Sequence, residues 1–169
     1  MKYFVARDPS FSLLSFDIFN PGVYKDRIIS LSDILGATTP DWTAFEAKGG
    51  KVLWVQGNDD PSVSPYANVN VYNSIIAKMG QTKVDNFMRF YLVPGLAHGG
   101  GNFSPTWDNL NILDNWVDKG NAPPSAPVAI DGTKTATKGR SRPMCSYPTW
   151  AKYNGFGDIN LASSFSCVK

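Results

Sequence analysis

The sequence predicts an α/β fold and, more specifically, one end of a larger parallel sheet. Two apolar runs without polar alternation, residues 51–57 and 87–93, are typical of strands buried on both faces of a parallel sheet. Each run is followed by a loop and a segment with apolar residues at helical spacing, giving a β-loop-α-β-loop-α order over 41–120. A crossover of this length joins neighbouring parallel strands. Two strands alone leave both outer edges unpaired, so we expect another segment or chain to complete the sheet.

The helices are placed by their end signals. Thr39 or Asp41 would cap a short helix over 41–47, and Ser64 followed by Pro65 marks the start of a helix that Gly80 ends. A further helix is expected from about 107 to 119, with Gly120 after its last turn. Residues 1–40 are expected to be an irregular lead-in with short helical segments.

Residues 121–169 are predicted to be a long, loop-rich segment because proline, glycine and serine are frequent there. Lys134, Lys138, Arg140 and Arg142 give this segment a basic character. No aromatic ladder interleaves these charges, so a solvated loop is favoured over a polyphosphate or nucleic-acid site.

Composition excludes several classes of protein. With 16 basic and 14 acidic residues in 169, the net charge of +2 provides no electrostatic footprint for nucleic acid. No apolar run approaches the roughly 20 residues of a membrane span, so no membrane partner is expected. The first residues are interrupted by charge too early for a signal peptide, so the protein is either intracellular or targeted by a segment outside this sequence.

The two cysteines, Cys145 and Cys167, both lie in the last 25 residues. A cross-link between them would stabilise a tail with little core of its own, and two free buried thiols are the alternative. Their spacing lacks a Cys-x-x-Cys pair and the one histidine is far away in sequence, so neither a metal site nor another cofactor is expected.

Candidate catalytic residues follow the two predicted strands. Asp59 and Asp60 come after the first strand, and His98 lies in a glycine-rich loop after the second. The carboxyl ends of neighbouring parallel strands meet at one edge of the sheet, where ligands bind in open α/β folds. An acid and then a histidine form the second half of a Ser…Asp…His order, in which the carboxylate orients the imidazole and the imidazole moves the serine proton. Taken singly, each is more often an ordinary turn or loop residue.

No nucleophile is assigned. The sequence has no Gly-x-Ser-x-Gly elbow, and Ser62 and Ser64 lie in the acid loop, where Ser64 is explained as a helix cap. Ser104, beside Pro105, is also expected to be a cap.

At these residues the sequence resembles the tannase and feruloyl esterase family. The similarity covers about residues 40–169. Its motifs are GGKVLWVQGNDDPSVSP at 49–65, VPGLAH at 93–98, WVDKGNAP at 116–123, RSRPMCSYP at 140–148 and FSC at 165–167.

This resemblance implies the C-terminal part of a serine-type carboxylic ester hydrolase of α/β-hydrolase fold, acting on esters of aromatic (phenolic) acids. Asp60 matches the family's catalytic acid and His98 its base. The family's lid is inserted before the acid, so residues 1–40, the lead-in, are expected to be the tail of that lid domain. Cys145 and Cys167 match a C-terminal disulfide, which implies a secreted or periplasmic protein. Many relatives have a cysteine beside the histidine, whereas this chain has Gly99.

Three interpretations remain open. The first is a hydrolase part whose serine comes from a complementary N-terminal segment or chain, so that this chain alone is inactive. The second is a non-catalytic phenolic- or carbohydrate-binding module derived from such a hydrolase. The third, an independent small α/β binding domain, requires a complete sheet.

Overall fold

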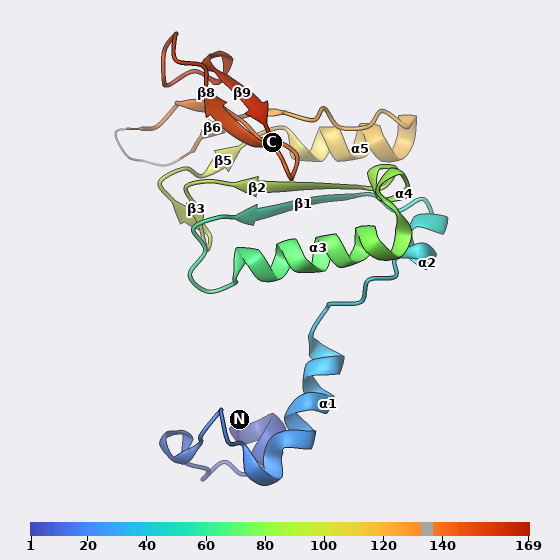
Figure 1. The fold of residues 1–169 in the computed structure, drawn as a ribbon, viewed down its shortest axis with the longest axis vertical. Coiled ribbons are helices and arrows are strands. Elements are labelled where there is room, and N and C mark those ends of the chain that lie inside the picture. Colours follow the sequence, from blue (N-terminus) through green and yellow to red (C-terminus); the bar gives the residue numbers. More distant parts are fainter. Residues whose placement is uncertain (133–136) are drawn as a thin grey trace. The chain divides into compact units, whose positions relative to one another are not determined.

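The computed structural model describes residues 1–132 and 137–169 (Figure 1). The chain divides into two compact units, Met1–Thr39 and Pro40–Lys169. Each unit is described by itself below.

The first unit consists of short helical segments, as the sequence predicts. They are a π-helical turn at Lys2–Ala6, 3-10 turns at Leu13–Ser15 and Gly22–Tyr24, and helix α1 at Lys25–Leu35. Phe11, Phe16 and Tyr24 pack edge to face, with the Phe11 and Tyr24 ring centroids 5.4 Å apart. No residue of this unit is buried, so these aromatic contacts do not close into a core.

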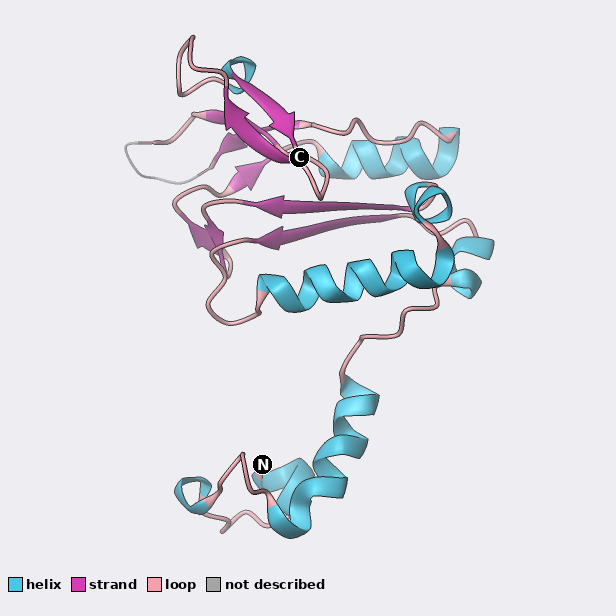
Figure 2. Cartoon of the chain, viewed as in Figure 1, coloured by secondary structure: helices cyan, strands magenta, loops and turns pink. Residues whose placement is uncertain are grey.

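The second unit is built on two parallel strands, β1 (Val52–Gly57) and β2 (Met88–Val93). Val52 is paired with Met88 and Gly57 with Val93. Helices α3 (Pro65–Met79) and α4 (Gln81–Asp85) form the crossover between them, and the short α2 (Thr43–Ala47) precedes β1 (Figure 2). The predicted strand–helix–strand order is therefore confirmed.

Helix ends follow the expected residues with one difference. Helix α3 begins at Pro65 and ends at Met79, directly before Gly80, whose φ of +84° favours glycine. The side chain of Ser64 makes no capping hydrogen bond, and its backbone carbonyl instead accepts from the N–H of Ala67 at 3.1 Å. Asp41 accepts the N–H of Thr43 at 3.0 Å ahead of α2.

Apolar residues pack on both faces of the strand pair, which explains why neither run alternates. On one face, Phe90 of β2 packs with Tyr72 and Ile75 of α3. On the other face, Tyr91 and Val93 belong to a second core. That core continues into the C-terminal part of the chain through Phe103, Ala129 and Met144.

Helix α5 (Asn109–Lys119) begins two residues later than predicted and ends at Gly120. Trp107 precedes the helix and packs edge to face with Tyr91, their ring centroids 5.6 Å apart. Trp116 of α5 is 2% exposed. The cationic groups of Lys51 and Arg89 lie 5.5 and 5.2 Å from the centre of its ring, so cation–π contacts attach α5 to the sheet.

Residues 121–169, predicted to be loop-rich, also contain short strands that the sequence does not predict. Strands β5 (Pro105–Thr106), β6 (Val128–Asp131) and β7 (Ser141–Pro143) form an antiparallel sheet, and β8 (Trp150–Tyr153) pairs with β9 (Phe165–Val168). In β6 the buried positions hold Ala129 and Asp131, whereas Val128 and Ile130 are exposed. This inverts the usual apolar-inward alternation, so the strand is not recognisable from its residues.

Ser104 and the basic residues also differ from expectation. Ser104 precedes β5 rather than a helix, and its N–H donates to Asp131 Oδ1 at 3.2 Å. Arg140 is not solvated, because its Nε forms an ion pair with the buried Asp131 carboxylate at 3.2 Å. Arg142 stacks over Phe165, whereas Lys138 is exposed as predicted. Lys134 lies outside the described residues.

The predicted open edge is present on one side of the sheet only. On the outer edge of β2, Tyr91 forms an antiparallel bridge with Ser146, and the N–H of Tyr147 donates to Phe90 at 2.8 Å. Along β1, no strand of the described ranges pairs with the edge away from β2. The chain thus covers one edge with its own C-terminal segment.

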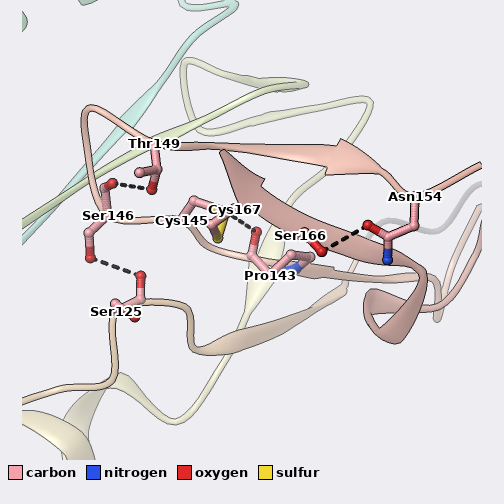
Figure 3. Close-up of a disulfide and its surroundings, with 8 residues drawn as sticks. All are labelled: Ser125, Pro143, Cys145, Ser146, Thr149, Asn154, Ser166 and Cys167. Atoms are coloured by element: carbon pink, nitrogen blue, oxygen red, sulfur yellow. Dashed lines mark hydrogen bonds between the residues drawn. A yellow bond between two sulfur atoms is a disulfide. The ribbon is translucent and has the colours of Figure 1, made fainter. Parts of the chain in front are cut away.

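Cys145 and Cys167 form a disulfide, which confirms the pairing and removes the free-thiol alternative. The bond joins the segment after β7 to β9 (Figure 3). Nearby, the hydroxyl of Ser146 donates to the carbonyl of Ser125 at 2.9 Å, and that of Ser166 donates to Asn154 Oδ1 at 2.8 Å. None of the described helices is long and apolar enough to cross a bilayer.

Candidate active site

Asp60 is held by the turn that follows β1. Its Oδ1 accepts the backbone N–H groups of Ser62 at 2.8 Å and Val63 at 2.9 Å, and its side chain is only 8% exposed. The hydrogen bond from Val63 is the largest influence, and together with those from Ser62 and His98 it lowers the pKa of Asp60 against the opposing effect of burial. The carboxylate is therefore ionised at neutral pH.

His98 is presented by a tight hairpin after β2. Strands β3 (Leu96–Ala97) and β4 (Gly100–Gly101) pair with Ala97 opposite Gly100, which leaves His98 and Gly99 as a two-residue turn. Gly99 has a φ of +76°, in the left-handed region that other residues rarely adopt. The side chain of His98 is 62% exposed.

The structure brings these two predicted residues together. His98 Nδ1 lies 3.1 Å from Asp60 Oδ2. One carboxylate oxygen, Oδ2, therefore contacts the imidazole, while the other, Oδ1, accepts hydrogen bonds from the turn. This contact orients the ring and leaves Nε2 directed to other partners. In the described residues, no hydrogen bond joins His98 to a serine hydroxyl.

Backbone hydrogen bonds hold the two loops in register. The N–H of Asn58 donates to Val93 at 2.9 Å, and the N–H of Asp59 donates to Leu96 at 3.0 Å. The parallel pairing of β1 and β2 thus extends past the strands into the acid and histidine loops. Gly57 makes the approach possible, because a Cβ there would lie 2.3 Å from the carbonyl oxygen of Leu96.

Gln56 is a residue of this site that sequence reasoning misses. It is 7% exposed, and its Nε2 donates to the carbonyls of Gly57 at 2.9 Å and Val63 at 3.4 Å. Its Oε1 accepts from the side-chain amide of Asn68 in α3. Gln56 therefore links β1, the far end of the acid loop and the crossover helix. A polar residue at the end of an otherwise apolar strand is the sequence feature that could have indicated it, because a buried amide requires hydrogen-bond partners.

The arrangement can perform general acid–base chemistry. An ionised carboxylate on Nδ1 selects one imidazole tautomer and stabilises the imidazolium that forms when Nε2 accepts a proton. Asp59 is exposed, and among the described residues it is Asp60, not Asp59, whose carboxylate contacts the ring of His98. Within the described residues, no group of three His, Cys, Asp or Glu side chains could hold a metal ion.

The serines lie elsewhere. Ser62 donates its N–H to Asp60, Ser64 precedes α3 and Ser104 precedes β5. None of the three stands on a strand-to-helix elbow of the kind that exposes a serine nucleophile.

Comparison with known proteins places this geometry in context. The family model described as "Tannase and feruloyl esterase" matches residues 1–168. An uncharacterized esterase of Agrobacterium fabrum is 63% identical over 168 residues, covering 99% of this chain and 30% of that protein. The mono(2-hydroxyethyl) terephthalate hydrolase of Piscinibacter sakaiensis is 37% identical over 142 residues, covering 82% of this chain and 23% of that enzyme.

The fold of this chain is also similar to that of a solved structure. The crystal structure of feruloyl esterase B from Aspergillus oryzae aligns with a TM-score of 0.81 at 22% identity, covering 99% of this chain and 36% of that one. The chain therefore has the fold of part of such an enzyme. It spans about a third or less of the length of the proteins it matches.

Proposed function

The chain belongs to the tannase and feruloyl esterase family, and from this premise we propose that it supplies the acid and base of a serine-type carboxylic ester hydrolase. The proposed enzyme has an α/β-hydrolase fold of which this chain is the C-terminal part. The serine nucleophile would come from a segment that this sequence does not contain. The observation that carries the proposal is the 3.1 Å contact between Asp60 Oδ2 and His98 Nδ1, made beyond the carboxyl ends of adjacent parallel strands.

The mechanism follows from that contact. His98 Nε2 takes the proton of the serine hydroxyl as its oxygen attacks the ester carbonyl, and the same proton then passes to the leaving alcohol. A water molecule releases the acid from the acyl-enzyme by the same route in reverse. Asp60 stays ionised throughout, since its hydrogen bonds from Val63 and Ser62 stabilise the charged form.

The proposed substrates are esters of aromatic acids, including phenolic ones. Support comes from the relatives, whose names include a terephthalate ester hydrolase and a feruloyl esterase. The proposed location is outside the cytoplasm, in the periplasm or secreted, because the Cys145–Cys167 disulfide is stable in an oxidising compartment. Residues 1–40 would form the tail of a lid domain that re-enters the hydrolase.

The test is a chimera in which this chain replaces the matching 30% of the Agrobacterium esterase. We expect the chimera to hydrolyse methyl ferulate. His98→Ala and Asp60→Asn should each lower kcat by roughly 10²–10⁴-fold, because they remove the base and the group that sets its tautomer. Asp158→Asn is the matched control, since Asp158 also accepts a backbone N–H in an exposed turn but lies outside the site.

Two outcomes would contradict the proposal. One is a folded chimera whose esterase activity is unchanged by His98→Ala. The other is a folded, inactive chimera that still binds ferulate or a carbohydrate independently of His98, which would favour the alternative of a non-catalytic binding module. Circular dichroism and size-exclusion chromatography establish folding in each case.

A further inference from the structure

A cavity lies apart from Asp60 and His98. It has a volume of about 280 Å³ and opens between the end of β2 and the disulfide-linked C-terminal strands. Neither Asp60 nor His98 lines it. Its walls come from segments far apart in the sequence, from Leu92 in β2 to Phe165 in β9, so only the folded chain forms it.

The walls of this cavity are largely apolar and aromatic. Phe103, Met144, Trp150 and Phe165 all line it. An apolar cavity of about 150 Å³ is enough to hold benzene, so this one has room for a substituted aromatic ring. Trp150 is 50% exposed, which leaves part of its indole available for contact.

Two guanidinium groups line the same cavity, and they differ in their partners. The charge of Arg140 is balanced by the buried Asp131 carboxylate, 3.2 Å from its Nε. Arg142 donates from Nη1 to the carbonyl of Ser141 at 2.7 Å, and no carboxylate of the described residues lies within 4.0 Å of it. The two guanidinium groups therefore share one nearby carboxylate, that of Asp131, which leaves a net positive charge at the cavity.

The surroundings of Arg142 disfavour the charged form of its guanidinium. Burial lowers the pKa of its guanidinium and the charge of Arg140 lowers it further, whereas the Asp131 carboxylate opposes both effects. The Cζ atom lies 4.2 Å from the centre of the Phe165 ring, so the guanidinium makes a cation–π contact with an aromatic wall of the cavity. A guanidinium has five N–H donors, and an oxyanion can accept two of them side by side.

We propose that this cavity binds a small aromatic carboxylate, with the carboxylate on Arg142 and the ring against Trp150 and Phe165. The site is separate from the proposed ester-hydrolysing site and does not depend on it. If that proposed function also holds, the cavity has the chemistry to retain the acid that the hydrolase releases.

The experiment titrates cinnamate into the full 169-residue chain and follows binding by calorimetry and by heteronuclear NMR. Cinnamamide is the matched neutral ligand. We expect cinnamate to bind and cinnamamide to bind at least about tenfold more weakly, as expected for loss of a charge-assisted hydrogen-bond pair. Arg142→Gln should weaken the binding of cinnamate by a similar factor. Lys138→Gln, which removes an exposed charge of the same segment, should leave the affinity for cinnamate unchanged.

Several results would overturn the proposal. They are equal affinity for the acid and the amide, unchanged binding by a folded Arg142→Gln variant, or binding lost in His98→Ala but kept in Arg142→Gln. Intermolecular NOEs in the unmodified chain provide a test that no variant's folding can confound. Contacts from the cinnamate ring to Trp150 and the Met144 methyl support the site, and contacts elsewhere, or none, refute it.

Discussion

Removing the Cys145–Cys167 disulfide is expected to lower the free energy of unfolding of the second unit by about 3.4 kcal/mol. The two cysteines are 22 residues apart, and closing a loop of that length in the unfolded chain gives this figure from chain entropy at 25 °C. The bond also fixes β9 beside the segment that contributes Met144 to the core. The unfolded chain gains freedom while the folded contacts remain.

The assay is urea unfolding of Cys145→Ala/Cys167→Ala, followed by tryptophan fluorescence. All five tryptophans lie in residues 40–169, so the signal reports on the second unit. A loss of 3.4 kcal/mol corresponds to a midpoint lower by between about 1 and 3 M urea, since m for small proteins is about 1–3 kcal/mol/M. The unmodified chain in reducing buffer is the matched control, because it lacks the cross-link but keeps both sulfur atoms.

The reasoning fails if the reduced chain and the variant both unfold at nearly the oxidised midpoint. It also fails if only the variant is destabilised, because the loss would then come from packing of the sulfur atoms. Agreement between the reduced chain and the variant is the result that supports a chain-entropy origin.

Three further predictions concern buried charge, loop approach and pH. Arg140→Met removes the guanidinium beside the fully buried Asp131 carboxylate. The free energy of unfolding measured in urea should therefore fall by about 3–5 kcal/mol. Gly57→Ala places a Cβ 2.3 Å from the Leu96 carbonyl oxygen, so the acid and histidine loops must separate and the ¹⁵N shift of the histidine Nδ1 should change. The pKa of Asp60 is lowered by folding, so its stabilising contribution is present above the unfolded value of about 3.9 and is lost as pH falls through the lower folded value. Acid unfolding should therefore show the stability difference between the unmodified chain and Asp60→Asn disappearing below that pH.

Each of these predictions has a control in the same chain. Asp131→Asn combined with Arg140→Met should recover much of the lost stability, because the buried charge is removed with its partner. Gly100→Ala lies in the same hairpin as the histidine, but an added Cβ there meets no atom within 4 Å, so the Nδ1 signal should hold. Asp158→Asn should not reproduce the pH effect of the change at Asp60. A histidine signal that moves equally in both glycine variants would contradict the role given to Gly57.

The central strands and helices could be predicted because each is marked by neighbouring residues. Val52–Gly57 and Met88–Val93 are apolar at most positions, and Gly80 and Gly120 directly follow helices whose apolar residues recur at helical spacing. The order of acid and histidine after these strands pointed to Asp59, Asp60 and His98, and the family resemblance singled out Asp60 as the acid. These features depend on local preference and on the rule that parallel strands end at one edge.

The C-terminal strands could not be predicted, because a charged residue such as Asp131 is stable at a buried position only when folding brings a partner beside it. Asp131 can be buried in β6 because Arg140, nine residues later, lies beside its carboxylate. Gln56 can end a buried strand because its side-chain amide donates to the Val63 carbonyl and accepts a hydrogen bond from Asn68. Neither partner can be recognised before the chain has folded.

The amino-acid sequence by itself determined the family resemblance, the strand–helix–strand order, the candidate acid and base, and the cysteines of the cross-link. Only the tertiary structure decided that Asp60 and His98 meet at 3.1 Å, that Ser146 covers one edge of the sheet and that Arg140 and Arg142 line one cavity. The physical reason is that helices and strands follow from residues close in the chain, whereas distances between side chains follow from strand register and from packing between segments tens of residues apart.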